Sequence, residues 1–101
     1  RPLAPRAFVV SAYPNAAPAE AKARAHDLSK YLQAQGLEKT RPYPWPRDGG
    51  TLWVVAVYFD GPNERQATLD LLHALPSDVP DQTFLHLRST ERDWPIAYDI
   101  L

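Results

Sequence analysis

An uncharged run of β-branched and aromatic residues at positions 51–59 constrains the fold of this chain most strongly. Such a run is typical of a buried β-strand. The pairs Gly49-Gly50 and Gly61-Pro62 mark turns at its two ends. Because apolar residues fill both alternating sets of positions, we expect both faces of this strand to be at least partly covered.

A helix is predicted to follow this strand directly. Asp60 suits the N-cap position and Pro62 suits the first helical turn. Apolar residues then recur at helical spacing until Pro76, which ends the pattern; they are Ala67, Leu71, Leu72 and Leu75.

The other regular elements are shorter or more polar. Residues 7–13 predict a first strand, and residues 18–35 predict a long helix. Four small or aliphatic residues form the apolar stripe expected on that helix: Ala21, Ala25, Leu28 and Leu32. Residues 83–88 are predicted to form a last strand, and alternation over residues 94–100 indicates a further short strand.

Prolines alternate with aromatic residues in the segment 37–46, with the letters PYPWP at its end. Proline has no amide hydrogen, so this segment cannot form a central strand, although an edge strand is allowed. A polyproline II segment suits the same residues.

The order β-α-β-β-α-β predicts a ferredoxin-like α+β fold, with two helices on one face of a four-stranded antiparallel sheet. The expected spatial order is fourth, first, third and second strand, which places the proline-bearing strand at an edge. For the 101 residues we expect one domain over residues 7–88, an arm over residues 1–6, and a tail over residues 89–101. The tail is expected to pack on the sheet or to extend it.

Composition excludes several classes of function. The formal net charge is −1, so there is no general attraction to nucleic acid or to an anionic membrane. Without cysteine there is no disulfide and no thiolate zinc site. His26, His73 and His86 lack the spacing of paired metal ligands, and no serine has the setting of a catalytic nucleophile. We therefore expect no cofactor, no metal, no transmembrane helix and no catalytic role. Because the chain lacks methionine, we expect it to be part of a larger chain or assembly.

Aromatic residues are the remaining functional signal. On an open sheet face, flat rings beside an arginine suit stacking on sugars or bases. The candidate binding residues are Ser11, Tyr13, Arg41, Tyr43, Trp45 and Tyr58. In the alternative interpretation the tail covers these rings, which then form a second layer of the core.

The chain resembles the SPOR domains, the peptidoglycan-binding modules of bacterial envelope proteins. In that family a strand of alternating hydrophobic residues precedes a turn, an acidic residue, an alanine and a leucine stripe. The matching residues here are Trp53, Val55, Val57, Glu64, Ala67 and Leu71, and FVVSAY is similar to the family's opening strand. The resemblance implies a non-catalytic module of the bacterial envelope or periplasm. It also implies binding of peptide-free glycan strands on the open sheet, through Ser11, Tyr13, Arg41, Tyr43 and Tyr58.

Two other functions are compatible with a sheet of this strand order. RNA-recognition domains share the strand order. Aligned on Phe59, their base-stacking positions fall on Val54 and Ala56 here, and aligned on Tyr58, only Trp53 fits. A protein-interaction domain would instead dock a partner through the edge strand at residues 41–45. An open face that is bare and ringed by aromatic residues favours glycan binding, whereas a face covered by residues 89–101 favours assembly through the edge.

Overall fold

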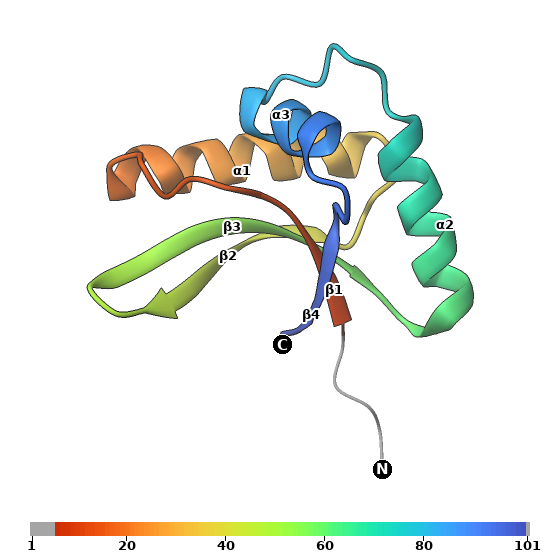
Figure 1. Ribbon diagram of the computed structural model, residues 1–101, viewed down its shortest axis with the longest axis horizontal. Coiled ribbons are helices and arrows are strands. Elements are labelled where there is room, and N and C mark those ends of the chain that lie inside the picture. Colours follow the sequence, from red (N-terminus) through yellow and green to blue (C-terminus); the bar gives the residue numbers. More distant parts are fainter. Residues whose placement is uncertain (1–5, 101) are drawn as a thin grey trace.

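The computed structural model describes residues 6–100, which form an α+β fold with a four-stranded antiparallel sheet and three helices. The strand order is β2-β3-β1-β4. Along the chain the elements are β1 (Arg6–Ala12), α1 (Pro18–Ala34), β2 (Thr40–Arg47), β3 (Gly50–Phe59), α2 (Gly61–Ala74), α3 (Gln82–Thr90) and β4 (Ile96–Asp99). Figure 1 shows α1 and α3 above the sheet and α2 beside one end of it.

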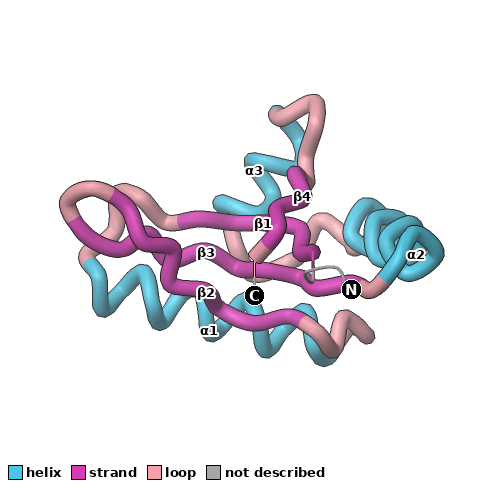
Figure 2. Tube along the Cα trace, turned by 90° about the horizontal axis from the view of Figure 1, so that it is seen from below, coloured by secondary structure: helices cyan, strands magenta, loops and turns pink. Residues whose placement is uncertain are grey.

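The opposite face of the sheet carries no helix, as the view from below in Figure 2 shows. We call it the open face. Directly opposed residues of antiparallel strands share a face, so the register assigns the strand residues of the open face: Ala7, Val9, Ala12, Arg41, Tyr43, Trp45, Arg47, Gly50, Leu52, Val54, Ala56, Tyr58, Ile96 and Tyr98.

The main core lies between the sheet and the helices. The predicted stripe of α1 is confirmed, because Ala21, Ala25, Leu28 and Leu32 are all buried. They pack with residues from β1, β3, α2, α3 and the tail, chiefly Phe8, Val55, Val57, Leu72, Phe84 and Trp94. Burial of this shared apolar surface is the main force that holds the helices on the sheet.

A β-bulge in β1 changes which side chains face the core. Val9 pairs with Ala56 and Ser11 pairs with Val55, so Val10 has no partner of its own. An extra residue reverses the alternation of side chains beyond it. Phe8 and Val10 therefore face the helices, and so does Ser11, which pairs with the core residue Val55.

The segment with alternating prolines is an edge strand, as predicted. Residues Thr40 to Arg47 of β2 pair with β3 over their whole length. Arg41, Tyr43 and Trp45 lie on the open face and the prolines lie on the other.

The predicted strand at residues 83–88 is wrong, because these residues belong to helix α3. The side chain of Asp81 caps this helix by accepting a 2.7 Å hydrogen bond from the amide of Phe84. The position beside β1 is filled instead by β4, within the segment where alternation indicated a short strand.

The tail is continuous with the rest of the fold. Residue 89 lies inside α3, Trp94 belongs to the main core, and β4 extends the sheet at β1. Of the predicted arm, Arg6 is the first residue of β1, while residues 1–5 lie outside the described residues, as does residue 101.

Candidate functional site

Rings from both outer strands of the sheet meet on the open face. The centroids of Trp45 on β2 and Tyr98 on β4 are 4.9 Å apart, with an interplanar angle of 84°. Tyr43 lies edge-on to Trp45 at 6.1 Å. Because β2 and β4 are separated by two strands, contact between them requires the open face to be concave. We call Tyr43, Trp45 and Tyr98 the aromatic cluster.

A stacked arginine and tyrosine lie towards the start of β2. The guanidinium carbon of Arg41 is 4.4 Å from the ring centroid of Tyr58, within the range of a cation–π interaction. Tyr58 is only 8% exposed, whereas Arg41 is exposed. Both residues line a groove of about 310 Å³ together with Glu38, Lys39 and Thr40. A ligand therefore meets the guanidinium edge of Arg41 before it meets the Tyr58 ring.

Lys39 beside this groove is held by two carboxylates. Its Nζ lies 2.7 Å from Oε1 of Glu64 and 3.0 Å from Oδ2 of Asp60. The hydrogen bond to Glu64, and then the one to Asp60, raise the pKa of the Lys39 ammonium. Lys39 is thus a compensated cation. Among the strand residues of the open face, the charge is carried by Arg41 and by Arg47 near the far end of β2.

The tail covers part of the open face and leaves part accessible. Ile100 is 8% exposed and packs with Ala7, Ala56 and Tyr58. Tyr43 and Trp45 lie against this small second core and remain partly exposed. The sequence allowed either an open aromatic face or a second core layer covered by the tail, and each holds in part. Tyr43 and Trp45 pack on the second core and are also partly accessible to solvent.

Two of the predicted site residues, Ser11 and Tyr13, lie on the other face of the sheet. Both are buried beneath the helices, because the bulge at Val10 reverses the alternation of β1. The hydroxyl of Tyr13 donates to Oδ2 of Asp81 at 2.7 Å, and that of Ser11 donates to Oδ1 at 3.3 Å. The expectation that Tyr13 lies on or near the open face is therefore wrong.

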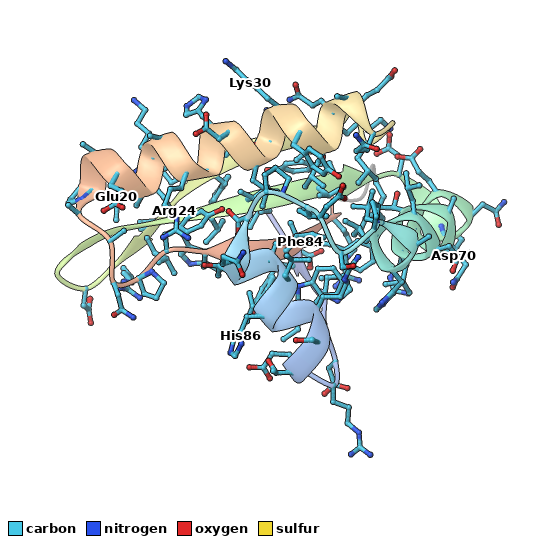
Figure 3. The ribbon with its side chains drawn as sticks, turned by 90° about the horizontal axis from the view of Figure 1, so that it is seen from above. Glu20, Arg24, Lys30, Asp70, Phe84 and His86 are labelled. Atoms are coloured by element: carbon cyan, nitrogen blue, oxygen red, sulfur yellow. The ribbon has the colours of Figure 1, made fainter. Side chains whose placement is uncertain are left out.

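The Asp81 carboxylate organises this buried polar cluster. Burial first, and then the hydrogen bond to Asp81, raise the pKa of the Tyr13 phenol. The guanidinium carbon of Arg24 lies 4.5 Å from the Tyr13 ring centroid, and Nη2 donates to Thr83 at 3.1 Å; Figure 3 shows Arg24 reaching from α1 towards β1 and α3. The bonds made by Ser11, Tyr13 and Arg24 each join segments far apart in the sequence, which is the pattern of a structural network.

The part of the chain that the structure describes contains no candidate metal site. No group of three or more histidine, cysteine, aspartate or glutamate residues there is placed to hold an ion. His73 instead packs edge-on against Trp94 at 5.4 Å. Within residues 6–100, no helix combines the length and apolar character needed to cross a membrane.

The open face thus unites Arg41, Tyr43, Trp45 and Tyr58 of the predicted site and adds Tyr98. Alternation over residues 94–100 was the signal for Tyr98, but alternation alone does not say which strand a tail will pair with. Comparison with protein-family models, with curated proteins and with solved structures found no match to this chain.

Proposed function

We propose that this chain is a non-catalytic binding module that holds a glycan strand on its open face. The observation that supports this function is the edge-on contact of Trp45 with Tyr98 on a concave, partly exposed surface. Tryptophan and tyrosine rings offer an apolar body with a polar edge, which matches the alternating C–H faces and hydroxyls of a sugar chain. Arg41 would bind hydroxyl or carboxylate oxygens at one end of the cluster.

The charge of the open face favours a glycan over a nucleic acid. Nucleic-acid binding draws most of its affinity from lysine and arginine side chains that neutralise phosphates. Among the strand residues assigned to the open face, the charged ones are Arg41 and Arg47, and the formal net charge of the chain is −1. A polymer with few charges fits this surface better.

We further propose that the module is a ferredoxin-like relative of the SPOR domains and works in the bacterial envelope or periplasm. Support for the fold comes from the strand order β2-β3-β1-β4, which is the expected order read from the other edge, although α3 is added before the last strand. Support for the location comes from the proposed ligand, since peptide-free glycan strands occur in the bacterial cell wall.

The alternative partner is a protein that adds a strand to the β2 edge. Pro42, Pro44 and Pro46 supply no amide hydrogens to such a partner. An added strand needs donors as well as acceptors, so the contacts of β2 favour the open face as the binding surface.

Co-sedimentation with purified peptidoglycan sacculi, with and without amidase pretreatment, tests the proposal. We expect binding to rise after amidase treatment and to fall about tenfold or more in Trp45→Ala, as for a central aromatic anchor. Lys30→Ala is the control, because Lys30 is exposed on α1 and points away from the sheet in Figure 3. Absence of binding by the folded protein would refute glycan binding and favour a protein partner.

A further inference from the structure

The two edges of the sheet differ in what they offer a further strand. Just before β2, the carbonyl of Lys39 accepts a 3.0 Å hydrogen bond from the amide of Tyr58. The residues of β2 in the same alternating set, Arg41, Tyr43 and Trp45, therefore direct their backbone groups towards β3. The prolines at 42, 44 and 46 belong to the other set and face outward, where they supply carbonyls but no amides. The side-chain amide of Gln33 also donates a 2.7 Å hydrogen bond to an outward carbonyl, that of Thr40. This edge is closed to pairing.

The β4 edge has the opposite character. Residues Ile96 to Asp99 contain no proline, and β4 pairs with β1 on one side only within the described sheet. An unpaired strand edge of this kind is a template for another strand. The β4 edge is therefore the place where residues 6–100 can extend their sheet.

Exposed apolar side chains gather on the same strand. Within residues 6–100, the large hydrophobic residues that stay exposed are Ile96, at 52%, and Tyr98, at 37%. They pair with Val9 and Ala7 respectively, so both lie on the open face. A cleft of about 380 Å³ adjoins them, lined by Val9, Leu87, Trp94 and the polar residues at positions 91–93.

We propose that two copies of this chain associate by antiparallel pairing of β4 with β4. The two-fold axis passes between the two Ala97 residues, which lie opposite each other. In this register Ile96 of each copy lies opposite Tyr98 of the other, so the exposed apolar side chains cover each other. Cross-strand pairs of aromatic and β-branched residues stabilise a sheet. The product is a continuous sheet with both open faces on one side.

Because β4 is complementary to itself in this register, a second copy of the chain is the partner that fits its edge. Slipping the register by one residue would put Ile96 opposite Asp99 and turn the helices of one copy towards the open face of the other. Because β2 cannot accept a strand, the assembly closes as a dimer and does not grow into a filament. This inference shares Tyr98 with the proposed glycan site, but it rests on the unpaired β4 edge, and its tests use no glycan.

The contact is small, because β4 has four residues. Interfaces below the standard size are weak or transient, so we expect a dissociation constant roughly between 10 µM and 1 mM. In sedimentation equilibrium the mass should rise from 11.4 kDa towards twice that value across this range. Ile96→Lys, which places a charge on an exposed edge position, should weaken association about tenfold or more.

Cysteine cross-linking tests the register directly, because the chain has no cysteine of its own. A mixture of Ile96→Cys and Tyr98→Cys chains should form a disulfide-linked heterodimer several times faster than either variant links to itself. Thr51→Cys, at an exposed position on the other side of the sheet, is the control. A mass that stays at 11.4 kDa throughout the concentration range would overturn the proposal. Self-linking of Ile96→Cys at the rate of the mixture would overturn the register.

Discussion

The indole Nε1 of Trp94 donates a 3.1 Å hydrogen bond to the carbonyl of Val10, the unpaired residue of the bulge in β1. A bulge leaves backbone groups without their ladder partner, and here the tail supplies one. Trp94 is 7% exposed and its ring meets Phe84 edge-on at 5.1 Å. The same contact therefore anchors the tail and stabilises the bulge that sets which β1 side chains enter the core.

Trp94→Phe should destabilise the fold by about 1–3 kcal/mol, because it leaves the buried carbonyl of Val10 without a donor while keeping an aromatic ring. Denaturant unfolding measures the change. Trp45→Phe is the matched control and should stay within about 0.5 kcal/mol, since its ring contacts on the open face survive. Equal losses in the two variants would show that the indole hydrogen bond is not what stabilises the bulge.

Asp81→Ala should be among the most destabilising single changes in the chain. It removes the N-cap of α3, which costs about 0.5–2 kcal/mol, and it also removes the acceptor of Tyr13 and Ser11. Asp78→Ala, in the exposed loop before α3, should change the free energy of unfolding little. Comparable midpoints for the two variants in urea would contradict a stabilising role for Asp81.

Tyr13 should make stability fall in alkaline solution. Its pKa is higher in the folded protein than in the unfolded chain, chiefly through burial and then through Asp81. A proton held more tightly by the folded state stabilises it fully below the unfolded pKa of about 10, and this contribution is lost as the pH rises above that value. Tyr13→Phe should therefore lose less stability between about pH 8 and about pH 11 than the unaltered protein.

Urea unfolding at the two pH values measures this difference. The remaining tyrosines and lysines are common to both proteins, so their titration cancels in the comparison. A parallel loss of stability in the two proteins would mean that ionisation of Tyr13 is not coupled to folding.

The central elements could be predicted because their patterns were strong. The uncharged run of β3 and the alanine and leucine stripe of α1 each indicate one element, and the prolines of β2 exclude a central strand. The prediction of a strand over residues 83–88 is wrong. Their apolar residues do not alternate strictly, and Asp81 just before them is a residue type that favours the N-cap of a helix.

The candidate site was predicted for β2 and β3 and missed for β1. Arg41, Tyr43, Trp45 and Tyr58 share a face because those strands pair without a shift in register. Ser11 and Tyr13 follow the bulge at Val10. The residue types in FVVSAY give no sign that the strand contains a bulge. A bulge depends on contacts distant in sequence, here the indole of Trp94, so local periodicity cannot reveal it.

The prolines of β2 should act as a block to assembly. Replacing Pro42, Pro44 and Pro46 together by threonine restores outward amides on a residue type that favours strands. With both edges then able to pair, we expect species larger than a dimer in light scattering at about 0.1–1 mM. Pro14→Thr, in an exposed turn outside the sheet, should leave the mass unchanged.

The two edges can be separated by one further variant. Adding Ile96→Lys to the triple threonine variant closes β4 again and leaves β2 as the edge that can pair. Pairing of β2 with β2 is isologous and closes, so the larger species should be replaced by dimers. A triple variant that behaves like the unaltered protein would show that the prolines do not control the edge, and that the exposed sheet is protected by another means.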